Sequence, residues 1–146
     1  MEIAIVLSSV LIGAISIYIT NKHYKKTQEL QDHKWEKELF TEFNKRYDLL
    51  NGTLMDVEKL QKAGTSLSEV HRKAINDFFN LCSEEYFWYK RGRINKDIWI
   101  SWHSGMNYWY NKVHIVQKMW EDEIREDSWK AYYLKKGESF FILKNN

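Results

Sequence analysis

The chain begins with an apolar run that is long enough to cross a lipid bilayer. From Ile3 to Ile19 there are 17 consecutive residues without a charge, and Thr20 and Asn21 extend the run to Lys22. As a helix rising about 1.5 Å per residue, this segment would span about 25 to 30 Å, a thin hydrocarbon core. The large apolar residues of this predicted anchor are Ile3, Ile5, Val6, Leu7, Val10, Leu11, Ile12, Ile15, Ile17 and Ile19.

A cleaved signal peptide and a buried soluble helix are the two alternatives to an anchor. A signal peptide has a basic segment before its apolar stretch and a small-x-small cleavage site after it. Here no basic residue precedes the run, and Tyr18, Ile19 and Thr20 stand where the cleavage site would be. We therefore predict an anchor over residues 1–21, followed by a helical domain over residues 22–146.

The charges that flank the anchor predict its orientation. Lys22, Lys25 and Lys26 follow it, whereas Glu2 precedes it. Because positively charged flanks stay in the cytoplasm, we expect a single-pass membrane protein, with lipid as a partner and the C-terminal domain cytoplasmic.

Small residues recur four positions apart within the anchor. The two pairs are Ala4 with Ser8 and Ser9 with Gly13. Such spacing lets two helix backbones approach closely and favours a homo-oligomer. Small residues are also common in membrane helices in general, so the spacing leaves both interpretations open.

A heptad-like seam follows the basic flank. Its apolar residues have gaps of 3, 4, 3, 4 and 3 and are Phe40, Phe43, Tyr47, Leu50, Leu54 and Val57. This spacing predicts a long amphipathic helix. Asn51 and Gly52 are typical of a hairpin turn, but the seam keeps its phase across them. We expect one continuous or slightly kinked helix that ends near Ala63 and Gly64.

Capping signals predict two further helices. Ser66 and Glu69 fit a capping box for a helix over residues 67–91, which Gly92 would close in a left-handed conformation. Asn95 is suited to cap the next helix. The predicted inner face of that helix consists of Ile98, Trp102, Met106 and Trp109.

The remaining signals complete an all-α prediction. Gly105 lies in mid-helix among large rings, where glycine costs about 1 kcal/mol relative to alanine, so we expect a close helix crossing there. Residues 113–124 predict another helical stretch, Ser128 a cap for a short one, and residues 140–143 a run packed against the bundle. The expected fold is an N-terminal transmembrane helix that continues into a cytoplasmic helical bundle.

Composition supports a helical domain with an aromatic core. Trp, Tyr and Phe make up 16% of the chain, and proline, which breaks helices, is absent. Cys82 is the single cysteine and cannot form an intrachain disulfide. The net charge of +2 gives little support to nucleic-acid binding, which usually shows a far stronger basic excess.

Local motifs identify no catalytic or metal centre. The five histidines include no pair spaced i, i+4, as two metal ligands on one helix face would be. Cys82 lies in an apolar stripe and is expected to be a buried structural thiol. No glycine-rich phosphate loop or nucleophile elbow occurs, and no arginine has a histidine five or seven positions downstream, the pattern of one group of helical ribonucleases. We expect no metal or cofactor.

Glu85 is a polar residue on a predicted core stripe. A buried carboxylate needs a partner or a raised pKa. We expect a structural hydrogen bond or ion pair, with a catalytic or ligand-binding carboxylate as the alternative. His103 on the next helix is a candidate neighbour.

Rings and positive charges alternate between residues 86 and 96. Such a patch could contact anionic lipid or single-stranded nucleic acid, and the simpler alternative is a core helix that ends in a solvated basic turn. The candidate patch residues are Trp88, Lys90, Arg91, Arg93 and Lys96.

The stretch Asn80-Leu-Cys-Ser-Glu-Glu-Tyr-Phe-Trp-Tyr-Lys-Arg-Gly-Arg-Ile, with Trp99, Ser101, Trp102, Gly105 and Met106 after it, resembles a pattern in small uncharacterised bacterial proteins. Those proteins have an N-terminal anchor and a helical domain. The resemblance covers about half of the chain and implies architecture only, with no site residues.

The expected function is interaction or assembly at the inner face of a bacterial membrane, with an unknown protein partner. One alternative is an enzyme acting on nucleic acid or a nucleotide through Glu85, His103 and the basic turn. The other is a peripheral lipid sensor that works through residues 86–96.

Overall fold

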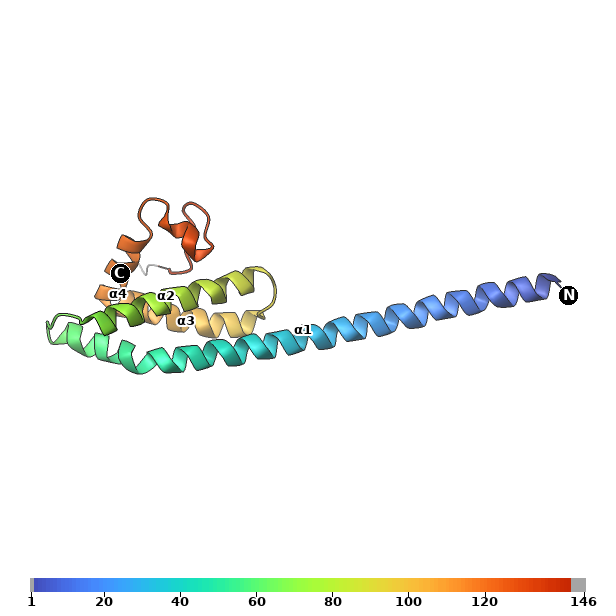
Figure 1. Ribbon diagram of the computed structural model, residues 1–146, viewed down its shortest axis with the longest axis horizontal. Coiled ribbons are helices and arrows are strands. Elements are labelled where there is room, and N and C mark those ends of the chain that lie inside the picture. The colour runs from blue at the N-terminus through green and yellow to red at the C-terminus, as the bar shows by residue number, and fades with distance from the viewer. Residues whose placement is uncertain (1, 143–146) are drawn as a thin grey trace. The chain divides into compact units, whose positions relative to one another are not determined.

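The structure is a computed structural model that describes the backbone of residues 2–142 and the side chains of residues 11–142. Within these residues the chain is all-α, without strands, which confirms the predicted class. The chain divides into two units, Met1–Lys37 and Glu38–Asn146. Its elements are α1 (Glu2–Lys62), α2 (Glu69–Lys90), α3 (Lys96–Lys112), α4 (His114–Glu123) and the 3-10 helix η1 (Ser128–Tyr132) (Figure 1).

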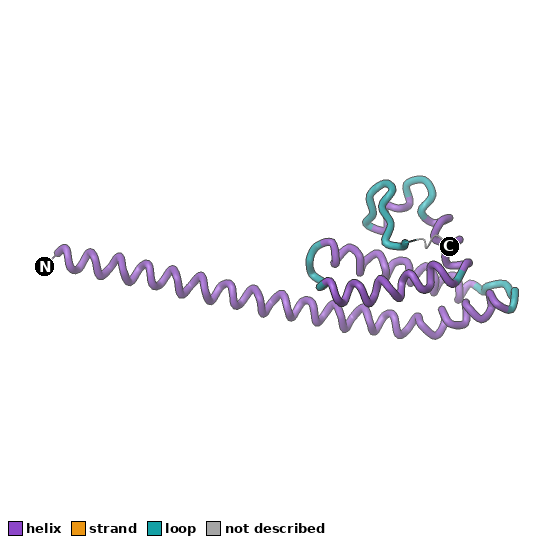
Figure 2. The backbone as a smooth tube through the Cα atoms, turned by 180° about the vertical axis from the view of Figure 1, so that it is seen from behind, coloured by secondary structure: helices purple, strands orange, loops and turns teal. Residues whose placement is uncertain are grey.

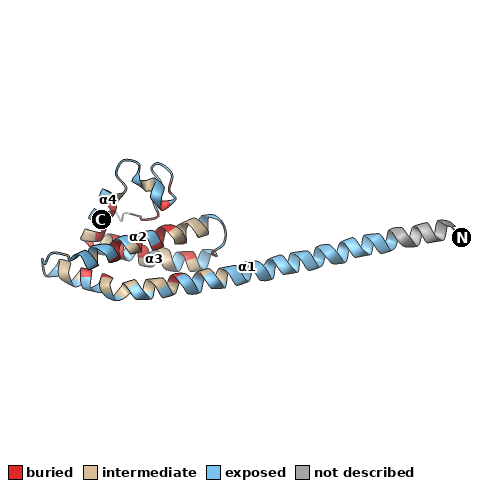
Figure 3. Ribbon diagram, viewed as in Figure 1, coloured by how far each residue is buried: buried red, intermediate tan, exposed pale blue. Residues whose placement is uncertain are grey.

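The first unit consists of the N-terminal part of α1, and its side chains from residue 11 to residue 35 are all exposed (Figure 3). Within the part of the chain that the structure describes, no helix is long and apolar enough to span a membrane. Several side chains of the predicted anchor lie outside the described residues. They are those of Ile3, Ala4, Ile5, Val6, Leu7, Ser8, Ser9 and Val10.

The second unit contains the rest of α1, which carries the predicted seam. The helix runs without a break through Asn51 and Gly52, as the phase of the seam predicts. Most seam residues pack into the unit's own core: Phe43, Leu54 and Val57 are buried, and Tyr47 and Leu50 are half-buried. The seam therefore folds this domain and is not left as a free face for a second chain.

Helix α2 begins two residues later than predicted, at Glu69. Its N-cap is Ser68, and the Nδ1 atom of His71 lies 2.7 Å from the Ser68 hydroxyl and 3.3 Å from the Ser68 backbone nitrogen. The predicted capping box of Ser66 and Glu69 is wrong, because the chain stays non-helical through Ser68 and Glu69 is the first helical residue.

The C-terminal end of α2 is as predicted. Gly92 has a φ of +68°, and its N–H donates to the carbonyl of Tyr89, while the N–H of Arg93 donates to the carbonyl of Trp88. These two bonds form a Schellman motif, which satisfies carbonyls that the helix leaves without partners.

Helix α3 begins at the predicted cap, since the Asn95 side chain accepts a hydrogen bond from the N–H of Ile98 at 2.9 Å. Its buried face is broader than predicted: it includes Trp99 and Tyr110, whereas Ile98 is only half-buried. The tertiary reason is that α3 contacts both α2 and α4.

Two expectations about the later part of the chain are wrong. Gly105 is not at a close helix crossing, because a methyl group added there would meet no described atom within 4 Å. Ser128 caps no helix either, since it is the first residue of η1 and Asp127 precedes it.

The core of the second unit is aromatic, as the composition predicts. Trp120 is fully buried, and its ring centroid lies 4.7 Å from that of Phe140 and 5.1 Å from those of Phe79 and Phe141. The segment after α4 is mostly loop (Figure 2), and η1 contacts α2. The predicted packing of residues 140–143 against the bundle is confirmed for Phe140 and Phe141 and is wrong for Ile142, which is 58% exposed; Leu143 lies outside the described residues.

Candidate functional site

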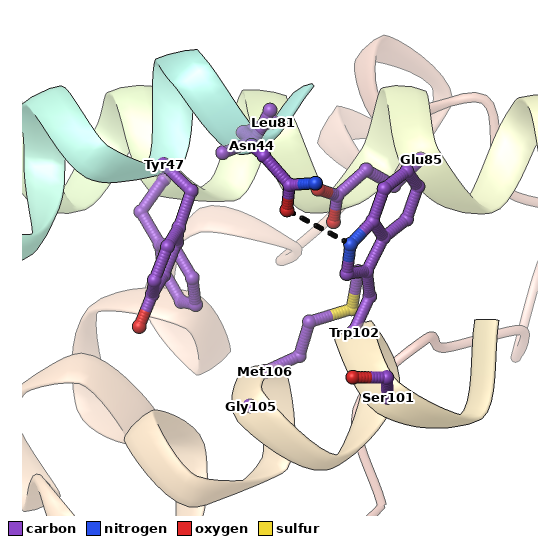
Figure 4. A pocket seen from close by; sticks show the side chains of 9 residues that line it. Asn44, Tyr47, Leu81, Glu85, Ser101, Trp102, Gly105 and Met106 are labelled. Atoms are coloured by element: carbon purple, nitrogen blue, oxygen red, sulfur yellow. Dashed lines mark hydrogen bonds between the residues drawn. The ribbon is translucent and has the colours of Figure 1, made fainter. Parts of the chain in front are cut away.

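A pocket of about 230 Å³ lies between α1, α2 and α3, entirely within the second unit. Each helix lines it at helical spacing, so the three inward faces meet there (Figure 4). The lining residues are Asn44, Tyr47, Phe78, Leu81, Glu85, Ser101, Trp102, Gly105 and Met106.

Glu85 is the acidic group of this pocket. The residue is only 5% exposed, and its carboxyl group makes no hydrogen bond or ion pair to any residue that the structure describes. Every fully buried side-chain oxygen or nitrogen among these residues has a partner, so the Glu85 oxygens are not fully buried and reach the open space of the pocket. In Figure 4 its carboxyl group points toward Asn44 and Trp102. The expected structural partner for Glu85 is therefore not observed in this region, and the acid faces the pocket.

Burial changes the acidity of Glu85. Loss of solvent raises the pKa of its carboxyl group, the charge of Arg46 partly opposes this and the charge of Glu84 adds to it, and the resulting pKa is about 8. Glu85 is therefore mostly protonated at neutral pH, and a neighbouring positive charge would favour its ionised form.

The nearest cation is already paired with the neighbouring acid. Arg46 donates to Glu84 through both terminal nitrogens, at 2.6 and 3.0 Å, in a bidentate ion pair. Because α2 turns successive side chains by about 100°, Glu84 faces Arg46 and Glu85 faces the pocket. Glu84 thus forms an ion pair within the fold, whereas Glu85 has no such partner among the described residues.

Hydrogen bonds orient the other polar groups of the pocket. Trp102 donates from its indole nitrogen to Oδ1 of Asn44 at 3.2 Å, so the Asn44 amide nitrogen is turned toward Glu85 (Figure 4). The Tyr47 hydroxyl accepts from the indole nitrogen of Trp109 at 2.9 Å and points away from Glu85. Asn44 is therefore the polar neighbour that Glu85 has within the pocket.

His103 does not join Glu85 in one site. Its Nε2 atom lies 2.9 Å from the backbone oxygen of Phe140, and its ring stacks on Trp99 with centroids 4.9 Å apart. His103 is not among the lining residues of the pocket. The two candidate polar residues therefore have separate environments.

Some residues of the predicted basic-aromatic patch, Trp88, Lys90, Arg91, Arg93 and Lys96, make contacts within the domain. Lys90 forms an ion pair with Glu138 at 2.9 Å, and its ammonium lies 4.4 Å from the centroid of the Tyr86 ring. Arg91 lies over Phe87, and Trp88 is half-buried. Arg93 and Lys96 are exposed at the turn between α2 and α3, so the structure does not gather the five residues into one free surface.

The remaining candidate groups for chemistry are the thiol of Cys82 and side chains that could bind a metal ion. The Cys82 thiol is fully buried, as expected, and burial raises its pKa well above the ordinary value, so it stays protonated. Among residues 11–142 no three metal-ligating side chains gather. The arrangement around Glu85 is suited to binding by charge and shape.

Sequence reasoning found Glu85 and assigned Tyr47, Trp102 and Met106 to apolar helix faces, but it did not predict the pocket that these residues line. Asn44 lies one position off the seam, and nothing in its local spacing indicates that it meets Trp102, 58 positions later. Gly105 was recognised as unusual, and it lines the pocket, with open space beside its backbone. No family model, no curated protein and no solved structure matches this chain.

Proposed function

We propose that this chain is a single-pass membrane protein of the bacterial inner membrane that acts in interaction or assembly, with its helical domain in the cytoplasm. The observation that carries the proposal is the exposed apolar surface of the first unit. Leu11, Ile12 and Ile17 are each more than 60% exposed, and no described residue covers them.

The exposed apolar surface of the first unit is favourable in lipid and unfavourable in water. Burying a large aliphatic side chain is favourable by about 1.5 to 3 kcal/mol, so a run of exposed isoleucines in water is costly. The apolar sequence continues upstream to Ile3 without a charge. The basic residues Lys22, Lys25 and Lys26 follow on one side only, which supports a cytoplasmic C-terminal domain.

The assembly part of the proposal rests on the anchor. The seam is packed within the second unit, so it does not supply an interface. Gly13 in α1 has open space around it, and a small residue there permits close approach by a second helix. A homo-oligomer would therefore form through the anchor.

The alternative functions have weaker support. An enzyme acting on nucleic acid or a nucleotide would need Glu85 and His103 in one site, but these residues lie in different environments. A lipid sensor would need the positive charges of the basic turn, but one of them, Lys90, forms an ion pair with Glu138. We therefore retain the anchored interaction protein as the proposed function.

Cell fractionation tests the anchor. The full chain should remain in the membrane after alkaline carbonate extraction. The double variant Ile12→Lys and Ile15→Lys should be released, because each lysine in the middle of a span costs about 3 kcal/mol. Ile100→Lys, an exposed position on α3, is the matched control and should stay in the membrane.

A reporter tests the orientation. Green fluorescent protein fused after Asn146 should fluoresce, and alkaline phosphatase fused there should be inactive. Extraction of the unmodified chain by carbonate would refute the anchor, and phosphatase activity would refute the orientation.

A further inference from the structure

We propose that the pocket between α1, α2 and α3 binds a small organic cation, a primary ammonium or guanidinium group on a short apolar stem, with the Glu85 carboxylate as its counter-ion. This inference goes beyond the proposed function and does not depend on membrane anchoring. It assigns a ligand class to a site whose residues all lie in the second unit.

The first argument is that Glu85 has an incomplete environment. A carboxylate that is 5% exposed normally has an ion pair or several hydrogen bonds, and this one has none among the described residues. Packing does not require an acid at this position, since glutamine has the same size. A ligand with N–H donors and a positive charge supplies what the site lacks.

The second argument comes from the charges around the acid. Arg46 and Tyr47 on α1 and Glu84 and Cys82 on α2 are the titratable groups near Glu85, and α3 adds none to the lining. Arg46 is held by Glu84. An anion would therefore meet a carboxyl group without a cation to receive it, and a positively charged ligand is favoured.

The third argument is that the lining of the pocket fits the apolar stem of the proposed cation. Phe78, Leu81 and Met106 are buried and present apolar surface, and the Trp102 ring adds an aromatic wall suited to a cation. A volume of about 230 Å³ is below the range of about 300 to 1,000 Å³ that holds drug-sized ligands. The site is therefore sized for a handful of heavy atoms.

The pocket has an entrance on the α3 side. Ser101 is exposed and Gly105 half-exposed, and space above the Gly105 backbone is open. A side chain larger than glycine at position 105 would reduce that space. The mid-helix glycine, for which no close helix crossing exists, is thereby explained as part of the pocket.

Ionisation of Glu85 adds a signature to binding. When the cation binds, the Glu85 carboxyl group loses its proton to solvent and forms the ion pair. Because the pKa of the free site is about 8, affinity should rise on the order of tenfold per pH unit below that value and level off above it.

Calorimetry on the full chain in dodecyl maltoside and phosphate buffer tests the proposal, with n-butylammonium and methylguanidinium as probes up to about 10 mM, the range for ligands this small. Butanol and butyrate are the neutral and anionic controls. We expect the cations to bind at least tenfold more tightly than butanol, and butyrate not to bind. Putrescine and N-acetyl-arginine methylamide distinguish a free amine from a basic protein side chain, the tighter of the two indicating the source.

Variants locate the binding in this pocket. Glu85→Gln should weaken cation binding at least tenfold and abolish its pH dependence. Gly105→Leu should block the pocket, whereas Gly52→Leu, at another helix-internal glycine with open space around it, should bind like the wild type. Circular dichroism checks that each variant is folded. If Glu85→Gln does not fold, the binding measured with Gly105→Leu tests the proposal. Equal binding of butanol and butylammonium, no binding of either cation, or wild-type binding by the folded Glu85→Gln or Gly105→Leu protein would overturn the proposal.

Discussion

Two adjacent carboxylates on α2 differ because their surroundings differ. Glu84 is half-buried and held by the guanidinium of Arg46, whereas Glu85 is buried beside a pocket without a partner among the described residues. Desolvation acts on the ionised form, so it raises the pKa of Glu85 to about 8. The same residue type thus contributes an ion pair at one position and a proton-binding group at the next.

The free energy of unfolding of the second unit should depend on pH because Glu85 binds a proton more tightly in the native state. The pKa rises from an ordinary value of 4.5 to about 8 on folding, so the native state binds more protons at Glu85, and the contribution of this group to stability is greatest below pH 4.5. As the pH rises toward 8 this contribution is lost, at up to about 1.4 kcal/mol per pH unit. Glu85→Gln should therefore gain stability relative to the wild type across this range.

Urea unfolding of both proteins in detergent, followed by tryptophan fluorescence between pH 5 and pH 8.5, measures this difference. The free energy of unfolding of the variant minus that of the wild type should increase with pH. A difference that stays constant would show that Glu85 keeps an ordinary pKa in the native protein.

At the scale of the element, the ends of the helices carry most of the local information. The Schellman motif at the end of α2 needs a residue at Gly92 with a φ of +68°, a left-handed conformation that a β-carbon disfavours. A methyl group there would meet no described atom within 4 Å, so the cost of a substitution is conformational alone.

Gly92→Ala should destabilise the second unit by about 1 kcal/mol for this reason. Gly92→Asn should lose less, because asparagine tolerates the left-handed conformation. Thermal unfolding monitored by circular dichroism compares the three proteins. If alanine and asparagine have the same effect, the conformation at this position is not what limits stability.

At the scale of the whole molecule, the second unit is closed by residues near its C-terminal end. Phe140 is buried against Trp120, with centroids 4.7 Å apart, and against Tyr86 at 6.1 Å. Truncating such a ring leaves a cavity, so Phe140→Ala should cost about 3 to 5 kcal/mol. Ile142→Ala, at a side chain that is 58% exposed, should cost less than about 0.5 kcal/mol. Urea midpoints of the two variants test this contrast, and similar midpoints would refute it.

Self-association is a prediction for the first unit. If the anchor mediates a homo-oligomer, Gly13→Leu should weaken it, since bulk prevents close backbone approach while apolar character is kept. Ile12→Leu is the matched control and should associate like the wild type. Cross-linking and light scattering in mild detergent provide the measurement. A wild-type protein that is monomeric over a wide concentration range would exclude assembly through the anchor.

The sequence by itself determined the helices and much of how they end. The spacing of Phe43, Leu54 and Val57 predicted an unbroken helix through Gly52, and Gly92 and Asn95 predicted an end and a start, because caps and periodicity act between residues close in the chain. The α2 start was misplaced because several polar residues near Ser66 can cap a helix and local spacing does not choose among them.

Only the tertiary structure decided which groups meet. The sequence marked Glu85 as an acid on an apolar stripe. Its lack of an ion pair among the described residues depends on Arg46, which lies 38 positions from Glu84 and pairs with that acid instead. His103 is directed to the Phe140 carbonyl by packing, not by spacing. Local patterns encode which face of a helix is apolar, whereas the pairing of polar groups follows from how three helices cross, and this depends on contacts far apart in the chain.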